Sequence, residues 1–162
     1  MALLELKNLK TFFATKRGTV KAVNGVSYSL DAGKVLGVVG ESGSGKSVSA
    51  MSILRLLDGN GYIDSGEILF NGVDLTKLSM NEMYKIRGNE ISVIFQEPMT
   101  SLNPVFTVSR QISEPLMIHQ GMTKKQAAAK AVELLSDVKI PNPEVVAKQY
   151  PHQLSGGMRQ RV

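Results

Sequence analysis

The sequence contains no cysteine and no tryptophan, and aromatic residues make up only 6% of its 162 positions. A chain without cysteine can form neither a disulfide nor a thiolate metal site, and it suits a reducing compartment. No stretch approaches the roughly 18 consecutive apolar residues of a membrane-spanning helix. The first residues, MALLELKNLK, lack the basic start, apolar run and cleavage site of a signal peptide. We therefore predict a cytosolic chain that is not itself embedded in a membrane.

Charged residues of both signs are present, with 19 Lys and Arg against 14 Asp and Glu and a formal net charge of +5. An excess of basic residues is typical of proteins that bind nucleic acids or anionic membranes. Here the basic residues are scattered along the chain, and few aromatic residues are available to stack on bases. We expect no nucleic-acid partner. The apolar fraction of 43% is ordinary for a single globular domain.

The first part of the chain carries strand patterns. Apolar and polar residues alternate at 3–9 and 20–30, with the turn-rich ATKRG between them, which predicts a small antiparallel β subdomain. VLGVV at 35–39 and ISVIFQ at 91–96 are continuously apolar, as in strands that are covered on both faces. GEILFNG at 66–72 predicts a further strand and turn.

Helical patterns occupy residues 47–57 and most of the chain beyond residue 100. The apolar positions of 47–57 predict a buried helix, and PNPEVVAKQYP at 141–151 predicts a short helix between prolines. Thr123 and Gln126 form a capping box at the start of another helix. Its expected buried face comprises Ala131, Leu134, Leu135 and Val138. A preceding helix, which Pro115 should kink or restart, is indicated by Val108, Ile112 and Leu116.

A glycine-rich loop between the strand at 35–39 and the helix at 47–57 matches G-x-x-x-x-G-K-[ST]. Its residues are Gly40, Glu41, Ser42, Gly43, Ser44, Gly45, Lys46 and Ser47. Glycines let the backbone turn its N–H groups inward and form a nest for phosphate oxygens at the positive end of the helix. Lys46 adds an ammonium for the β- and γ-phosphates, and the Ser47 hydroxyl can bind Mg²⁺. The alternative is a Gly/Ser turn that happens to precede Lys-Ser, but the strand and helix on either side favour nucleoside triphosphate binding.

A second glycine-containing segment, LSGGMRQR at 154–161, predicts a helix start with Ser155 as the N-cap residue. Gly156 and Gly157 would leave backbone donors exposed there, so that a second anion site could form. The alternative is an ordinary capped helix. The segment resembles the signature sequence of ABC ATPases, and Ser155 follows Lys46 by 109 residues, which fits the spacing in that family.

Further runs extend this resemblance over essentially the whole chain. LKNLKTFF, AVNGVSYSL, GESGSGKS, FQEPMTSLNP and YPHQLSGGMRQR resemble those of dipeptide, oligopeptide or nickel import ATPases. The resemblance implies an α/β fold with an incomplete phosphate-loop NTPase (RecA-like) core, an N-terminal antiparallel β subdomain and a helical subdomain. It divides the partial nucleotide-binding domain 1–162 into the β subdomain and phosphate-loop core (1–96) and the Q-loop, helical subdomain and signature (97–162).

The resemblance also assigns roles to single residues. Gln96 matches the Q-loop glutamine, which reaches Mg²⁺ and the attacking water. Phe13 occupies the place of the aromatic residue that stacks on adenine, although core packing of Phe13 or of the adjacent Phe12 is the alternative. The implied ligands are ATP and Mg²⁺. The family's acidic Mg²⁺ residue, catalytic glutamate and switch histidine follow the signature helix, and neither His119 nor His152 matches the last of these. We therefore expect weak or absent hydrolysis by the 162 residues alone.

The implied partners are a second, homologous ABC ATPase chain, transmembrane permease subunits and, indirectly, an extracytoplasmic solute-binding protein. The resemblance places the protein peripherally on the cytoplasmic face of the inner membrane. Two alternatives remain. One is a soluble ABC-type ATPase that acts on nucleic acid or ribosomes, and the other is a module that only binds nucleotide or oligomerises.

Overall fold

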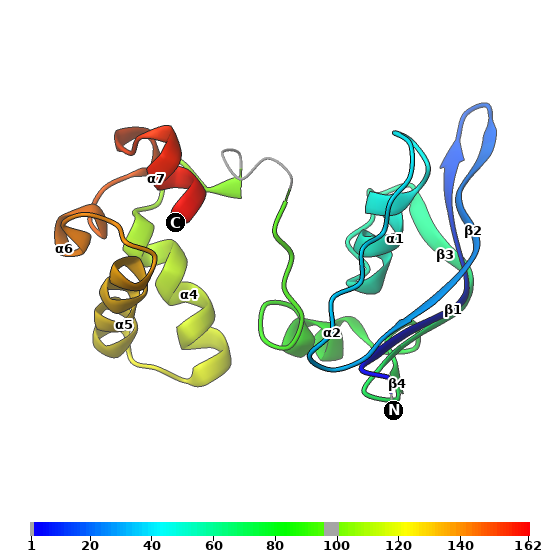
Figure 1. Cartoon of the computed structure of the whole chain (residues 1–162), viewed down its shortest axis with the longest axis horizontal. Coiled ribbons are helices and arrows are strands. Elements are labelled where there is room, and N and C mark those ends of the chain that lie inside the picture. The colour runs from blue at the N-terminus through cyan, green and yellow to red at the C-terminus, as the bar shows by residue number, and fades with distance from the viewer. Residues whose placement is uncertain (1, 96–100) are drawn as a thin grey trace. The chain divides into compact units, whose positions relative to one another are not determined.

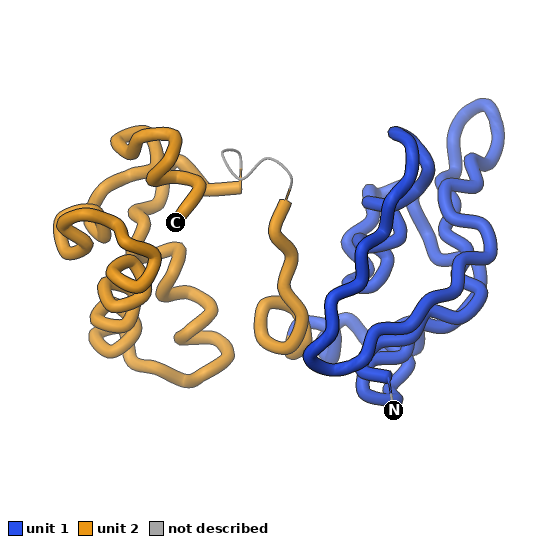
Figure 2. The backbone as a smooth tube through the Cα atoms, viewed as in Figure 1, with its two compact units in different colours: residues 1–84 blue, residues 85–162 orange. Residues whose placement is uncertain are grey.

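The computed structural model describes residues 2–95 and 101–162. The chain divides into two compact units, residues 1–84 and 85–162 (Figure 2), and each is described by itself.

A four-stranded antiparallel sheet forms most of the first unit (Figure 1). Its strands are β1 (Leu4–Thr15), β2 (Gly18–Leu30), β3 (Gly61–Phe70) and β4 (Val73–Asp74), in the order β2-β1-β3-β4. The alternating patterns at 3–9 and 20–30 thus correctly predicted a hairpin. Its strands are longer than predicted, and only Lys16 and Arg17 separate them. The strand predicted at 66–72 is also confirmed and begins earlier, at Gly61.

Register shifts interrupt the pairing of β1 with both of its neighbours, and two of these shifts lie next to Thr11. Thr11 pairs with Val23 and the next residue pairs with Lys21, which leaves Ala22 of β2 unpaired. Asp64 of β3 is bypassed in the same way. A bulge bends the strand and re-aims its backbone groups. The Ala22 bulge directs its carbonyl oxygen toward the start of helix α1 (Lys46–Ile53).

Helix α1 packs on the sheet through hydroxyl groups. The Ser52 Oγ lies 2.8 Å from the Thr11 Oγ1, and both side chains are buried. The Ser49 Oγ lies 3.1 Å from the hydroxyl oxygen of Tyr28 on β2. A buried apolar helix over 47–57 was predicted, but the helix ends at Ile53 and Leu56 is exposed. The side that packs on the sheet is its serine side, since small paired hydroxyls permit close approach without an unsatisfied polar group.

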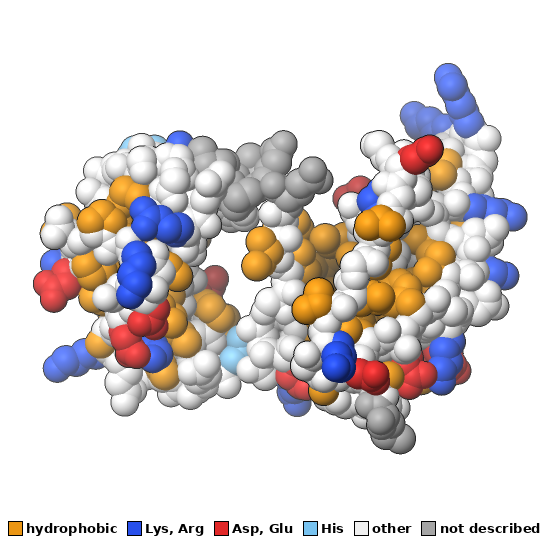
Figure 3. Space-filling model, viewed as in Figure 1, with side chains coloured by type: hydrophobic (Ala, Val, Ile, Leu, Met, Phe, Trp, Pro, Cys, Tyr) orange, Lys and Arg blue, Asp and Glu red, His pale blue; other side chains and the backbone are white. Residues whose placement is uncertain are grey.

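The predicted buried strands at 35–39 and 91–96 are wrong for the described residues. Val35 and Val39 are 98% and 93% exposed, and residues 35–39 form no strand. In the second segment, only Ile91 makes an isolated bridge, and Ile94 is 94% exposed. A continuously apolar strand is stable only between neighbouring strands and covering layers. The described part of the chain gives these segments neither, and Figure 3 shows hydrophobic side chains at the surface of the first unit.

A network around Asp74 stabilises the end of β4. Its Oδ1 accepts hydrogen bonds from the Thr76 backbone N–H at 3.0 Å and the Thr76 hydroxyl at 2.8 Å, and its Oδ2 lies 2.9 Å from the Lys77 Nζ. Burial raises the pKa of Asp74, but the hydrogen bonds from Lys77 and Thr76 together outweigh it, so that the net pKa lies below its ordinary value. A depressed pKa means that the folded state favours the ionised carboxylate.

This network predicts a pH-dependent contribution to stability. The contribution is fully present above the pKa of Asp74 in the unfolded state, which is about 4. It is lost as the pH falls through the lower pKa of the folded state. Asp74→Asn should lower the free energy of unfolding at pH 7 by about 1 kcal/mol and flatten its acid dependence. Urea unfolding at pH 7 and pH 3 measures both effects. The control is Glu133→Gln, which breaks an exposed pair with Lys130 and should cost less than about 0.5 kcal/mol. Equal losses in the two variants would contradict the assignment.

Helices form the second unit (Figure 1). They are α4 (Val108–Gln120), α5 (Lys124–Asp137), α6 (Pro143–Val146), the 3₁₀ turn η1 (Pro151–Gln153) and α7 (Gly156–Arg161), while α2 (Met80–Ile86) lies at the junction of the units. The hydrophobic core of the second unit consists of Val108, Leu135, Ile140, Val146, Ala147 and Leu154. These residues come from α4, α5, α6 and the segments between the helices.

Local signals predicted the helix starts correctly. The Thr123 side chain accepts from the Gln126 N–H and the Gln126 side chain accepts from the Thr123 N–H, which confirms the capping box. The short helix at α6 is confirmed as well. Pro115 does not restart its helix, since α4 continues through it. Pro115 lies on the exposed side of α4, where water can satisfy a carbonyl that loses its partner.

The buried face of α5 is rotated from the predicted one. Ala127, Ala131 and Leu135 are buried, whereas Val138 is 40% exposed. Spacing alone identifies a helix but not which of two adjacent apolar rows meets the core. Within residues 2–95 and 101–162, no helix combines the length and the apolar character that crossing a membrane requires.

Candidate functional site

The glycine-rich loop at 40–47 ends in an uncapped helix start. Gly45 is the N-cap residue of α1, with φ 89° and without a side-chain cap hydrogen bond. Gly43 is also left-handed, with φ 79°. The first N–H groups of a helix have no partner within the helix, and a glycine N-cap leaves them open to a ligand. Residues 40–47 therefore present backbone donors at the positive end of α1.

Gly45 also fits where no other residue can. A Cβ on Gly45 would lie 2.3 Å from the carbonyl oxygen of Ala22, the bulged residue of β2. Gly40 is constrained as well, since a Cβ there would lie 2.8 Å from the Ser44 Oγ. The end of the loop at Gly45 is thus held closely against β2.

Lys46 extends back over the loop. Its Nζ donates to the carbonyl oxygens of Gly40 at 2.8 Å and Glu41 at 2.6 Å, and to the Ser44 Oγ at 3.3 Å. All of these acceptors are neutral oxygens, so that none of these three hydrogen bonds pairs the ammonium with a negative charge. An anion that approaches the loop would meet both this charge and the backbone donors.

A cavity of about 470 Å³ lies beside the loop. It is lined by Lys21, Asn24 and Tyr28 of β2 together with Gly40, Ser44 and Lys46 of the loop. Ser42 and Ser47 are exposed. Among the described residues, no three acidic or histidine side chains gather into a metal-binding group. Ser47, the predicted Mg²⁺ ligand of the loop, has a hydroxyl of the kind of oxygen donor that this ion prefers, and this role stays a prediction.

Phe12 and Phe13 lie on opposite faces of the sheet. Thr11 contacts α1, and side chains alternate along a strand, so that Phe13 is on the α1 face and Phe12 on the other. Phe13 is half-buried and lies next to Gly61 and Leu57. Phe12 is buried and makes an edge contact with Tyr62 at 6.2 Å between ring centroids. Phe13 is thus the ring that shares a face with the loop.

The remaining predicted residues belong to the second unit. The Ser155 side chain accepts from the Met158 N–H at 3.3 Å and caps α7, while buried Leu154 anchors the segment. Gly156 and Gly157 are exposed, as is Ser155. Gln96, the predicted Q-loop residue and Mg²⁺ ligand, lies outside the described residues.

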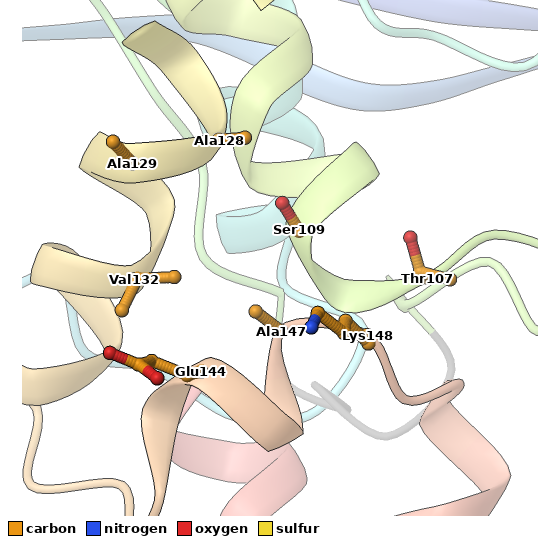
Figure 4. A pocket seen from close by; sticks show the side chains of 8 residues that line it. All are labelled: Thr107, Ser109, Ala128, Ala129, Val132, Glu144, Ala147 and Lys148. Carbon is orange, nitrogen blue, oxygen red and sulfur yellow. The ribbon is translucent and has the colours of Figure 1, made fainter. Parts of the chain in front are cut away.

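A second cavity, of about 700 Å³, lies in the helical unit (Figure 4). Its apolar part is formed by Ala128, Ala129 and Val132 of α5 with Ala147. Polar side chains border it: Thr107, Ser109, Glu144 and Lys148. Backbone hydrogen bonds from the Ser109 N–H to the Ala147 carbonyl and from the Val108 N–H to the Gln149 carbonyl hold its walls together. No sequence pattern indicated this cavity, because its walls come from segments that are distant along the chain.

A loop that combines open donors, left-handed glycines and a lysine before a helix defines a phosphate-loop nucleotide-binding protein. The sequence model of the ABC transporter family matches residues 23–162, and the chain belongs to this family.

Several curated relatives are similar over almost the whole chain. The oligopeptide transport ATP-binding protein AppD of Bacillus subtilis is 52% identical over 99% of this chain and 49% of its own length. The dipeptide transport ATP-binding protein DppD of Lactococcus lactis is 52% identical over 98% of this chain and 46% of its own. The oligopeptide transport ATP-binding protein OppD of Escherichia coli is 49% identical over 99% of this chain and 48% of its own length. The chain thus spans about half the length of these relatives.

Solved structures show the same fold. The dimeric structure of MJ0796, a bacterial ABC transporter cassette, has a TM-score of 0.81 and 27% identity, over 98% of this chain and 66% of that one. A post-hydrolysis state of the MJ0796 cassette, bound to ADP and Pi, gives a TM-score of 0.79 at 26% identity over the same shares. The fold is therefore that of an ABC ATPase cassette, incomplete relative to the full cassette.

Proposed function

We propose that the chain is the nucleotide-binding part of an ATPase subunit that powers peptide import through an ABC transporter. The observation that carries the proposal is the loop at 40–47, where an uncapped helix start and the Lys46 ammonium converge on one space. The names of the relatives, which are oligopeptide and dipeptide transport proteins, support the substrate class. Residues 1–96 would hold the nucleotide, and residues 97–162 would contact partners.

Each residue of the loop has a distinct task in this proposal. The amides of Gly43 to Ser47 donate to phosphate oxygens at the positive end of α1, and the Ser44 N–H leaves the Glu41 carbonyl oxygen to do so. Lys46 leaves the Gly40 and Glu41 carbonyls and pairs with the β- and γ-phosphates, since a charged acceptor makes the stronger hydrogen bond. The face of the Phe13 ring stacks on adenine. A bound Mg²⁺, held by Ser47 and Gln96, would supply charge neutralisation along the triphosphate.

The signature residues would act on a second subunit. Ser155, Gly156 and Gly157 are exposed at the start of α7, where they can meet the nucleotide bound by a neighbouring chain. We propose a homologous ATPase as that neighbour, in a peripheral assembly on the cytoplasmic face of the inner membrane. Permease subunits would be direct partners in this assembly, and an extracytoplasmic solute-binding protein an indirect one.

Calorimetry of the 162-residue chain tests nucleotide binding. MgATP should bind at one site per chain, and magnesium tripolyphosphate should bind more weakly because it lacks a base that can stack on Phe13. Phosphate release should stay at the level of a Lys46→Met chain, because phosphoryl transfer needs an oriented water and a metal clamp beside the phosphate cradle. Absence of heat with MgATP would contradict the proposed function. Turnover above the Lys46→Met level would contradict only the expected inactivity of these residues alone.

The cavity in the helical unit supports the permease as a partner. Its alanine-rich wall would let the backbone of a partner helix approach closely, and Glu144 and Lys148 offer both signs of charge at its border (Figure 4). We therefore propose that a cytoplasmic helix of the permease binds here.

Filling this cavity should prevent the permease from binding. Ala129→Trp in the whole subunit should preserve MgATP binding but abolish copurification with the permease, because the indole occupies the partner's space. Lys125→Trp places the same side chain at an exposed position of α5 that does not line the cavity, and should leave copurification intact. Retained copurification of the Ala129→Trp subunit would contradict the proposed docking site.

A further inference from the structure

Gly61, the first residue of β3, lies directly beside the Phe13 ring. Gly61 and Phe13 are paired across β1 and β3. A Cβ on Gly61 would lie 2.7 Å from the Phe13 Cε1 and 3.1 Å from its Cδ1. The Leu57 Cβ would lie 3.1 Å from the same point. The ring thus occupies the space that any side chain at position 61 would need.

Backbone conformation does not explain this glycine. Its φ lies outside the left-handed region, in contrast to Gly43 and Gly45. Any residue could adopt the Gly61 backbone, so that the constraint is the lack of space for a Cβ beside the Phe13 ring and the Leu57 Cβ. An aromatic ring packed over a cross-strand glycine is a known way of stabilising that pair.

The backbone around Gly61 is firmly held. Its N–H donates to the Asp58 carbonyl at 2.7 Å, and the Ala14 N–H donates to the Asn60 carbonyl at 2.9 Å. The Asn60 side-chain amide donates in turn to the Ala14 carbonyl at 3.1 Å. Because these hydrogen bonds hold the turn at the end of β1, a Cβ at position 61 would move the Phe13 ring and not strand β3.

The position of the ring agrees with a role beside the loop. Gly45 approaches β2 at Ala22, next to Val23, which pairs with Thr11. Phe13 is two residues after Thr11 on the same face of β1. At the rise of a β-strand, the two residues lie roughly 7 Å apart. A base bound against Phe13 would therefore follow the phosphates along one face of the sheet.

We propose that Gly61 is a positioning residue that sets the Phe13 ring in the orientation that stacks on adenine, and so contributes to the affinity for the base of the nucleotide. The inference rests on the proposed function, because it assumes that Phe13 contacts the base. Gly61 itself touches no ligand and acts only through the ring.

Calorimetry with two probes separates this role from a structural one. Gly61→Ala should raise the Kd for MgATP about tenfold, the effect of a lost base–aromatic stack, and leave the Kd for magnesium tripolyphosphate unchanged. Gly59→Ala is the matched control, because a Cβ on Gly59 meets no atom within 4 Å and its φ is not left-handed. It should leave both constants unchanged.

A double-mutant cycle completes the test. Phe13→Leu should weaken MgATP binding to a similar extent, and Gly61→Ala added to Phe13→Leu should have no further effect. Additive losses, equal weakening of both probes, an unchanged Kd for MgATP or an unfolded Gly61→Ala chain would each overturn the inference. If the unsubstituted chain binds neither probe, the proposed function fails and the inference falls with it.

Discussion

Gly45→Ala should abolish measurable MgATP binding by the chain. Two independent penalties act at this position. A φ of 89° is unfavourable for alanine by about 1–2 kcal/mol, and the new Cβ would lie 2.3 Å from the Ala22 carbonyl oxygen. The loop must then leave β2, which moves its amides away from the phosphates. We expect the Kd to rise by at least about 100-fold.

Variants of two other glycines distinguish the effect of the contact with Ala22 from the effect of the left-handed backbone. Gly43 has a φ of 79° but open space around its Cβ position, so that Gly43→Ala carries the strain alone and should be less damaging. Gly37 has neither constraint, and Gly37→Ala should bind MgATP normally. Calorimetry on the three variants gives the order. If Gly43→Ala loses as much affinity as Gly45→Ala, the contact with Ala22 does not matter.

Lys46→Met should weaken MgATP binding by about 100-fold, since hydrogen bonds to charged groups contribute about 1.5–3 kcal/mol each. Methionine retains the length of the side chain and removes the ammonium. The variant should also exchange the amide hydrogens of residues 41–45 faster without nucleotide, because the Gly40 and Glu41 carbonyls lose their donor.

Lys46→Arg is the control for charge. It keeps the positive charge but replaces a compact ammonium with a planar fork, and should recover part of the affinity. Calorimetry and hydrogen exchange on both variants measure the two effects. Normal MgATP affinity in Lys46→Met would show that the lysine does not contact the phosphates.

Features that depend on neighbouring residues could be predicted from the sequence. The capping box at Thr123 and the N-cap at Ser155 follow from residues within three positions of each other, and the hairpin follows from two alternating segments around a short turn. The phosphate loop is equally local, because its glycines and lysine lie within eight positions. The pattern therefore predicted the position of the loop before helix α1, while the roles of its residues stay predictions.

Features that depend on distant partners were missed or wrong. Residues 35–39 have the composition of a buried strand, but burial requires neighbouring strands that the described residues do not supply. The role of Ala22 depends on a bulge that appears only when β2 pairs with β1. The role of Gly61 could not be predicted either, since its constraint comes from the Phe13 ring, 48 positions earlier in the chain.

Amide chemical shifts of the phosphate loop test the proposed binding mode most directly. When MgATP is added to the isotopically labelled chain, the backbone N–H signals of residues 43–47 should shift most, with those of Phe13 and its strand neighbours next. The signals of Gly156 and Gly157 should stay in place while the chain is monomeric. Saturable shifts elsewhere, with the loop signals unmoved, would contradict phosphate binding at the start of α1.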